Sequence, residues 1–311
     1  MLAVTVRGDG SPDLCELPTP PTPVGGVLVR VLACGLCGSD VEKLARGEAV
    51  AGAVLGHELT GKVVDGVLPV GTRVALAHHV PCGSCALCRD GHEPLCPSFT
   101  ASRLEPGGFC ELTAASRAHV EHALLPLPGA VGDLAATLVE PLACVLRGTE
   151  QLPDGPVLVA GAGTIGLLAG AVLRAQGAEV RVLETDPRRA RFAAGVGLTA
   201  PEPGERFAGA FLTATAAFPA ACELLAPAAR IVVFAGGAPQ PLDLDALYRR
   251  ELSIAGVRSS TPRHLRAALA LIESGAVEVE SLIDCVLPLD AFADGLARYR
   301  ERSVRKVVFR P

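Results

Sequence analysis

The sequence contains no tryptophan and only two tyrosines, and aromatic residues make up 4% of its 311 residues. A hydrophobic core must therefore be built mainly from alanine, valine and leucine. Long apolar runs are also missing, because the most apolar stretch, residues 157–172, is interrupted by glycines such as Gly161 and Gly163. It is too short and too rich in glycine to span a membrane. No charged amino-terminal region precedes an apolar segment, so we expect a cytoplasmic protein without membrane association.

An excess of positive charge is absent as well. The 28 lysines and arginines are outnumbered by 33 aspartates and glutamates, which gives a formal net charge of −5. Binding to nucleic acid depends on clustered basic side chains that neutralise phosphates, so no nucleic-acid partner is expected. With 50% hydrophobic and 20% charged residues the composition is typical of a globular protein. The length suffices for two domains.

Cysteine, in contrast, is abundant, with eleven residues. Four of them are closely spaced: Cys82, Cys85, Cys88 and Cys96. A secreted disulfide framework would be small and evenly studded with cysteines, so metal ligation in a reducing compartment explains them better. Two-residue gaps let consecutive thiolates turn back onto one ion, and four thiolates complete a closed tetrahedral shell. The pattern predicts a structural zinc lobe at residues 82–96.

Two alternatives to a structural zinc lobe are four unrelated cysteines in a loop and a zinc ribbon that contacts nucleic acid. The ribbon is disfavoured because Arg89 is the one basic residue inside the lobe and Glu93 lies close to it.

The chain changes character near residue 150. Before it, the sequence predicts a compact, mostly β domain with short strands at residues 27–32, 61–64 and 72–77. Residues 1–7 are predicted to form an opening strand, and four prolines between residues 18 and 23 exclude a regular element directly ahead of residues 27–32. Residues 131–147 are predicted to be helical, and Pro141 is expected to kink or restart that helix.

After residue 155, strands and helices alternate, which predicts a parallel sheet covered on both faces. The expected strands are residues 157–160, 180–183, 209–213, 230–234 and 252–255. The expected helices are residues 164–176, 187–194, 219–225 and 262–274. A helix at residues 290–300 and a strand at 304–309 are expected to return to the first domain. The predicted division is therefore domain 1–147, domain 148–285 and a returning segment 286–311.

Residues 161–166 read Gly-Ala-Gly-Thr-Ile-Gly, directly after a predicted strand and at the start of a predicted helix. This is the context that a dinucleotide-binding turn requires. The first two glycines allow a tight turn and close approach of a pyrophosphate, and the third lets helix and sheet pack. The free N–H groups and the dipole of the helix N-terminus favour the phosphates. The candidate cofactor-binding residues of this turn are Gly161, Gly163, Thr164, Ile165 and Gly166.

Glu184 stands at the end of the next predicted strand. Its carboxylate is expected to accept hydrogen bonds from the ribose 2′-hydroxyl and to repel a 2′-phosphate, which favours NAD over NADP. Arg188 and Arg189 follow closely, so NADP stays open, and Arg189 is a further cofactor-binding candidate. A flavin, or no ligand at all, is the alternative interpretation of the pattern.

Three further segments carry reactive residue types: Gly-Leu-Cys-Gly-Ser-Asp at 35–40, Gly-His-Glu at 56–58 and Val-Glu-Pro at 139–141. Each alone has a plain explanation, since a single cysteine often acts as a small hydrophobic residue. Together with the cysteine lobe and the glycine turn, however, they occur in the order seen in zinc-containing medium-chain dehydrogenases. Over nearly its whole length the chain resembles the sorbitol and threonine dehydrogenase branch of that family. The resemblance implies an α/β protein with a mostly β GroES-like catalytic domain and a Rossmann domain with a doubly wound parallel sheet.

The resemblance also implies roles for particular residues. Cys37 and His57 are expected to bind a catalytic zinc ion, and either Glu58 or Glu140 could supply the carboxylate ligand. Ser39 matches the hydroxyl that relays the substrate proton in this family. Two neighbouring cysteines, Cys34 and Cys144, are interpreted as packing residues. Glu42 stands where relatives usually have a histidine in the proton relay, and Asp40 is expected to organise the loop.

Zinc with an open coordination position lowers the pKa of a bound alcohol, and a nicotinamide accepts hydride. We therefore expect an oxidoreductase with two zinc ions per subunit, one catalytic and one structural, acting on a secondary alcohol of polyol or sugar-like type with NAD. The alternatives are an L-threonine-type amino alcohol dehydrogenase, a catalytically silent NAD-binding zinc scaffold and a zinc-free quinone reductase. The family implies a homodimer or homotetramer. Short connections at residues 48–56, 65–71 and 197–208 leave the substrate open.

Overall fold

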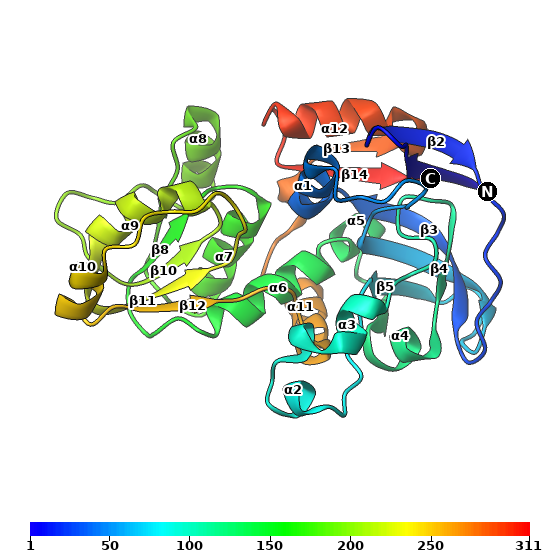
Figure 1. Ribbon diagram of the computed structural model, residues 1–311, viewed down its shortest axis with the longest axis horizontal. Coiled ribbons are helices and arrows are strands. Elements are labelled where there is room, and N and C mark those ends of the chain that lie inside the picture. The colour runs from blue at the N-terminus through cyan, green and yellow to red at the C-terminus, as the bar shows by residue number, and fades with distance from the viewer. The chain divides into compact units, whose positions relative to one another are not determined.

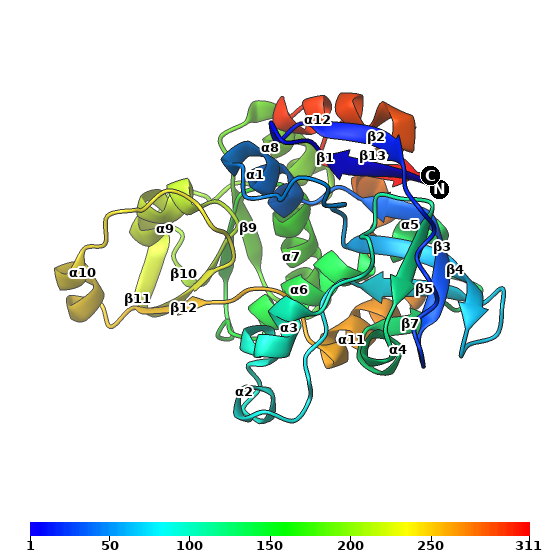
Figure 2. The same ribbon diagram turned by 45° about the vertical axis from the view of Figure 1, so that its right-hand side comes forward.

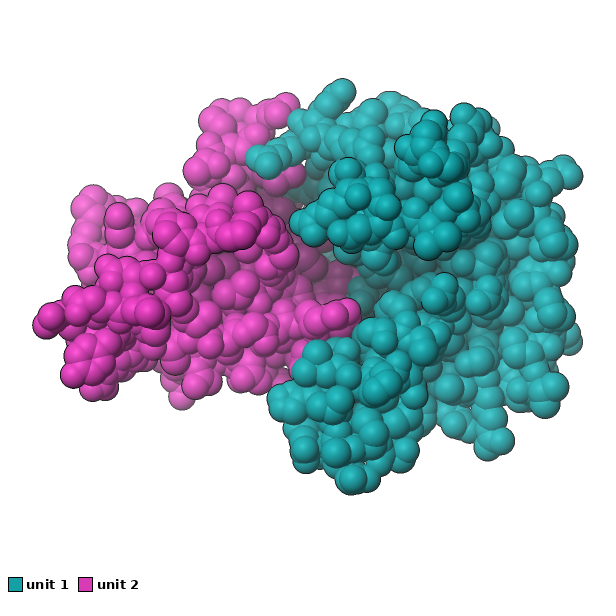
Figure 3. All heavy atoms as spheres, in the orientation of Figure 1, with its two compact units in different colours: residues 1–140, 261–311 teal, residues 141–260 magenta.

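The computed structural model describes residues 1–311, which form two compact units (Figure 3). Unit 1 consists of Met1–Glu140 and Thr261–Pro311, and unit 2 consists of Pro141–Ser260. The chain thus leaves unit 1, builds unit 2 from one continuous segment and returns. No helix combines the length and the apolar character that crossing a membrane requires.

The unit boundaries differ from the division at residues 148 and 286 expected from the sequence. The first boundary falls inside α6 (Val139–Thr149), so only its first turn belongs to unit 1. The second lies before α11 (Pro262–Glu273), well ahead of the expected return. Leu265 of α11 is buried and lines the same small apolar cavity as Leu59 and Ala75. This burial explains why α11 belongs to unit 1.

Unit 1 is built on a seven-stranded sheet in the order β13-β14-β3-β4-β5-β7, with β6 added beside β3 (Figure 1). The strands are β3 (Val27–Gly35), β4 (Glu58–Gly66), β5 (Arg73–Ala77), β6 (Leu112–Ala115), β7 (Leu124–Pro126), β13 (Ile283–Pro288) and β14 (Lys306–Arg310). A separate hairpin is formed by β1 (Leu2–Val6) and β2 (Pro12–Glu16). Strand β3 pairs antiparallel with β4, β6 and β14, so it lies at the centre of the sheet.

Short helices connect these strands. The α-helices of unit 1, besides α11, are α1 (Gly38–Arg46), α2 (Ala86–Arg89), α3 (Pro97–Ala101), α4 (Arg117–His122), α5 (Asp133–Ala136) and α12 (Phe292–Arg300). Its 3-10 helices are η1 (Glu93–Leu95), η3 (Glu280–Leu282) and η4 (Leu289–Ala291).

The predicted helix at 131–147 is two helices, α5 and α6, so of the two expected effects of Pro141 the helix restarts and does not kink. The interruption falls before Pro141, which lies in the first turn of α6. A proline is tolerated in a first turn because the N–H groups there have no partner within the helix.

A cluster of three phenylalanines ties the C-terminal elements to the rest of unit 1. The ring of Phe109 lies 4.9 Å from that of Phe292 on α12 and 5.7 Å from that of Phe309 on β14. The rings of Phe292 and Phe309 are 4.7 Å apart. These separations are typical of aromatic pairs, which contribute beyond the area they bury. All three rings belong to the hydrophobic core of unit 1, whose other members are mainly valine, leucine and alanine.

Unit 2 is a five-stranded parallel sheet in the order β12-β11-β10-β8-β9 (Figures 1 and 2). Its strands are β8 (Val157–Ala160), β9 (Val180–Leu183), β10 (Phe207–Leu212), β11 (Leu225–Val233) and β12 (Ser253–Gly256). Its helices besides α6 are α7 (Thr164–Ala175), α8 (Pro187–Gly195), η2 (Thr215–Ala217), α9 (Phe218–Leu224) and α10 (Leu244–Arg249).

The strand order reverses at β8, since the chain steps to β9 on one side and β10 lies on the other. Right-handed crossovers then place α7 and α9 on opposite faces of the sheet. This is the doubly wound arrangement expected from the sequence, and ligands bind such sheets at the point of reversal. No helix lies between α8 and β10, where residues 197–208 form one of the short connections noted in the sequence.

Phe309→Ala is expected to lower the free energy of unfolding by about 3–5 kcal/mol, because a fully buried ring is lost and a cavity remains. Urea denaturation followed by circular dichroism measures the change. Val24→Ala is the control, since Val24 is 100% exposed and its truncation should cost less than about 0.5 kcal/mol. Equal stability of the two variants would contradict the role given to the aromatic cluster.

Candidate active site

The turn after β3 presents Cys37 as the N-cap residue of α1. Leu36 is fully buried and anchors the turn, and its N–H donates to the carbonyl of Val307 at 2.9 Å. Asp40 in the first helical turn accepts the Cys37 N–H at 3.3 Å, and the Ser39 hydroxyl donates to Cys37 Sγ at 3.3 Å. The turn therefore places the Cys37 sulfur at the N-terminus of α1, beside the Ser39 hydroxyl.

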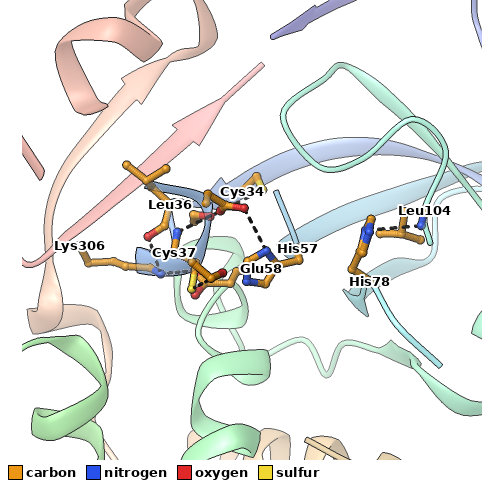
Figure 4. A network of polar contacts seen from close by, with 11 residues as sticks. Cys34, Leu36, Cys37, His57, Glu58, His78, Leu104 and Lys306 are labelled. Atoms are coloured by element: carbon orange, nitrogen blue, oxygen red, sulfur yellow. Dashed lines mark hydrogen bonds and ion pairs between the residues drawn. The ribbon is translucent and has the colours of Figure 1, made fainter. Parts of the chain in front are cut away.

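Glu58 is the first residue of β4 and His57 directly precedes it, and strand pairing brings both to this turn, with Glu58 opposite Gly35. The ligand atoms of Cys37, His57 and Glu58 all lie within 4.8 Å of one another (Figure 4). A tetrahedral zinc ion with bonds of about 2.0–2.3 Å needs ligand atoms about 3.3–3.8 Å apart. The three side chains therefore fit a zinc ion of the kind that keeps a further position open.

Asp40 orients the histidine of this group. Its carboxylate is 1% exposed, and Oδ1 lies 3.4 Å from His57 Nδ1. Burial opposes both charges, but the neighbouring His57 lowers the pKa of Asp40, and Asp40 together with Cys37 raises the pKa of His57. Because the carboxylate contacts one ring nitrogen of His57, the other ring nitrogen is available to bind a metal. Histidine ligands are commonly oriented in this way.

Lys306 belongs to the same site, although it was not among the site residues predicted from the sequence. Its ammonium group and the Glu58 carboxylate form an ion pair in which each side chain is 2% exposed, and Nζ also donates to the carbonyl of Leu36 at 3.2 Å (Figure 4). Burial opposes the charge, but Glu58 and then Cys37 raise the pKa of Lys306. The one available signal was a lysine at the head of an apolar strand.

Glycine at position 35 makes this pairing feasible. A Cβ atom there would lie 2.4 Å from Glu58 Oε2 and 2.8 Å from Lys306 Cε. Any larger residue would therefore push the carboxylate and the lysine out of place.

The remaining candidates lie outside the three-residue group. Glu140 is half-buried in the first turn of α6 and is not among the side chains that meet Cys37 and His57. Glu42 has a side chain 55% exposed, 3.8 Å from Arg46. Cys34 is fully buried, and burial holds the pKa of its thiol well above the usual value, which fits a packing residue.

The four-cysteine lobe forms a second group, held by the short elements α2, η1 and α3. The sulfur of Cys82 lies 3.9 Å from that of Cys88 and 3.5 Å from that of Cys96, and the sulfurs of Cys85 and Cys88 are 3.5 Å apart. Four sulfurs about 2.3 Å from one zinc ion are separated by about 3.8 Å. Hydrogen bonding from Ser84 and the Cys85 N–H lowers the pKa of Cys82 to about 5. Sulfur spacing and polar surroundings thus fit a four-thiolate zinc site.

The glycine turn of unit 2 follows β8 at the reversal of the strand order and leads into α7. Gly161 has φ +101°, a conformation that glycine adopts without strain. A Cβ atom on Gly166 would lie 1.8 Å from the Gly161 carbonyl oxygen, so helix and turn can meet only with glycine there. The helix begins at Thr164 with Gly163 as N-cap, which leaves its first N–H groups available to a phosphate.

Glu184, just after β9, accepts hydrogen bonds from this turn and from the residues that follow it. One carboxylate oxygen accepts the Ala162 N–H at 2.8 Å, and the other accepts the N–H groups of Thr185 and Asp186 at 2.8 and 2.9 Å. A carboxylate has about four acceptor positions, so capacity remains for a ribose hydroxyl. Arg189 reaches the same turn, since its Nη1 lies 4.0 Å from where a Cβ atom of Gly163 would be, and its Nε is buried without a hydrogen-bond partner.

Comparison with known proteins agrees with this architecture. Residues 23–128 match the alcohol dehydrogenase GroES-like domain family. D-altritol 5-dehydrogenase of Agrobacterium fabrum is 33% identical, with 93% of each chain covered. Sorbitol dehydrogenase of Halalkalibacterium halodurans is 29% identical over 91% of this chain and 90% of that protein.

Among solved structures, one described as a short chain alcohol dehydrogenase from Escherichia coli CFT073, in complex with NADH, has a TM-score of 0.88. It is 25% identical, and 100% of this chain and 99% of that chain are covered. The chain belongs to the zinc-containing medium-chain alcohol/polyol dehydrogenase family. The expected family, the expected fold of a GroES-like and a Rossmann domain, and the expected class of enzyme, an NAD(P)-linked oxidoreductase, are thereby confirmed.

Cys96→Ser is expected to lower the zinc content by one ion per chain and to lower the melting temperature, because a closed structural shell contributes directly to folding. Metal analysis of the purified protein and a thermal melt measure the two effects. Cys15→Ser is the matched control, since Cys15 lies on β2 outside the lobe. Full zinc retention by Cys96→Ser would refute the site.

Glu184→Gln is expected to shift the preference between NAD and NADP by about tenfold or more toward NADP, because the negative charge that opposes a 2′-phosphate is removed. The ratio of kcat/KM for the two coenzymes, with one alcohol, measures the shift. Glu179→Gln, a glutamate just ahead of β9, should leave the ratio unchanged. An unchanged ratio in Glu184→Gln would show that another residue selects the coenzyme.

Proposed function

We propose that the protein oxidises a secondary alcohol of polyol or sugar-like type with NAD, using a catalytic zinc ion held by Cys37, His57 and Glu58. The observation that carries the proposal is the meeting of these three side chains: Cys37 from the turn after β3, Glu58 from the first position of β4 and His57 from the residue before it. Chance would rarely place a thiol, an imidazole and a carboxylate within 4.8 Å of one another in partly buried surroundings. The substrate class follows the names of the relatives, which include altritol and sorbitol dehydrogenases.

When bound, zinc supplies a Lewis acid that lowers the pKa of the substrate hydroxyl, and NAD supplies the hydride acceptor. The residues of the chain do the remaining work. Asp40 holds the His57 ring through Nδ1. The Ser39 hydroxyl, at hydrogen-bond distance from Cys37 Sγ, accepts the substrate proton and passes it toward solvent. Glu42 is exposed beside Arg46, so we assign it no place in the first proton transfer.

Coenzyme binding is assigned to unit 2. The N-terminus of α7 and the glycine turn receive the pyrophosphate, and Glu184 accepts the adenosine ribose. Glu140 is the alternative to Glu58 as the carboxylate ligand of the zinc ion.

The finer features of the enzyme are also proposals. The lobe cysteines hold a second, structural zinc ion, which gives two per subunit and suits a reducing compartment such as the cytoplasm. The enzyme assembles as a homodimer or homotetramer. In support, β12 is an edge strand of the unit 2 sheet with Ile254 40% exposed, and such edges are ordinarily covered.

A screen for NADH formation tests the proposed reaction. Polyols, sugars, simple secondary alcohols and L-threonine are offered with NAD to the zinc-loaded protein, and ultraviolet absorbance follows turnover. Turnover of polyols or sugars is the expected result. A preference for L-threonine would replace the substrate class with amino alcohols, and no turnover of any alcohol would favour a silent NAD-binding scaffold.

Cys37→Ser sharpens this test. The variant is expected to fold, to keep the lobe zinc and to lose at least about 100-fold in kcat/KM, because a zinc ligand in the reacting centre is removed. Cys15→Ser should turn over the alcohol at the rate of the unaltered protein. Undiminished turnover by Cys37→Ser would refute the assignment of the catalytic site.

A further inference from the structure

The buried pair of Glu58 and Lys306 carries an inference that the proposed function does not contain. Lys306 is the only lysine or arginine among the buried residues of the chain, and its ammonium contacts one of the three candidate metal ligands. We propose that Lys306 is a positioning residue that competes with the catalytic metal for the Glu58 carboxylate. It thereby keeps Glu58 a weak, exchangeable ligand. The inference rests on the proposed function, since it takes Cys37, His57 and Glu58 as metal ligands.

Geometry makes Glu58 the group through which Lys306 acts. The lysine extends from the start of β14 toward Glu58, and its second acceptor is the neutral carbonyl of Leu36 (Figure 4). The missing side chain of Gly35 leaves the space that the Glu58 carboxylate and the end of Lys306 occupy. Because both charged groups are 2% exposed, water screens their attraction little.

Two effects of this pair act in the same direction on metal affinity. In the metal-free protein, the ammonium of Lys306 neutralises the buried Glu58 carboxylate. Without it, the unpaired charge would destabilise the metal-free state. Zinc binding to Glu58 must weaken that contact or share the carboxylate with the ammonium, which reduces electron donation to the metal. Removal of the lysine should therefore raise the affinity of the site for a divalent metal. A group that only supported the ligand would have the opposite effect, since loss of such support ordinarily costs about 10–100-fold in affinity.

The experiment is a double-mutant cycle on the full chain, with cobalt(II) as the probe and zinc retained in the lobe. Cobalt absorption bands report the affinity of the unaltered protein, Lys306→Met, Glu58→Gln and the double variant. Lys306→Met is expected to bind cobalt at least about tenfold more tightly than the unaltered protein. In the Glu58→Gln background the same substitution should change affinity by less than about threefold, because the lysine acts through that carboxylate.

Two results would overturn the inference. One is a cobalt affinity that is unchanged or reduced in Lys306→Met. The other is an equal gain in both backgrounds, which would make Lys306 a general positive charge near the metal. Cobalt binding by none of the four proteins would instead refute the proposed catalytic site, and the inference with it.

A matched control and a second variant complete the design. Lys62→Met makes the same substitution at an exposed lysine on β4, the strand that carries Glu58, and should leave cobalt affinity unchanged. If Lys306→Met fails to fold, Lys306→Gln replaces it, because its amide still donates to Glu58 without a charge. A second measure is the gain in melting temperature on cobalt binding, which should be larger in the lysine variant than in the unaltered protein.

Discussion

The antiparallel pairing of β14 with β3 is the contact on which the rest of unit 1 depends. Val308 lies opposite Gly35 and Phe309 opposite Cys34, and the Leu36 N–H extends the pairing to Val307. This register brings Lys306 to Glu58 and Phe309 to Phe109, although each pair joins distant parts of the sequence. The same β3 strand sets Glu58 through its pairing with β4. A slip of one residue would turn these side chains to the other face of the sheet, so core and site share one register.

The two candidate metal-binding groups are built in opposite ways. The lobe draws all four sulfurs from one short segment, and its order depends on close sequence spacing and local backbone N–H groups. The other group combines residues of β3's turn, β4 and β14, and it is surrounded by buried charges. Asp40 faces the imidazole on one side, and Lys306 contacts the carboxylate. Two of the three candidate ligands therefore have a buried charged neighbour, a carboxylate beside the imidazole and an ammonium beside Glu58.

A site built from one short segment can be predicted from the sequence, whereas a site assembled from distant segments cannot. The lobe and the glycine turn were predictable because the chemistry of each lies within a few residues, and the strands of unit 2 because they are short apolar runs between helices. Cys37 and His57 came from resemblance alone, since nothing local links them. Lys306 could not be found this way, because a lysine ordinarily faces solvent and only long-range strand pairing buries it. For the same reason the boundary at Thr261 was missed: the amphipathic pattern of α11 does not say against which unit Leu265 packs.

The discontinuity of unit 1 has a consequence for the newly made chain. Unit 2 is one uninterrupted segment, whereas unit 1 lacks β13, β14 and α12 until synthesis has passed through unit 2. Domains generally fold as units as they emerge from the ribosome. Cys37, His57 and Glu58 are therefore made early but wait, without the buried lysine, while a complete dinucleotide fold emerges after them. The sheet of unit 2 can therefore be completed before β14 brings Lys306 to Glu58.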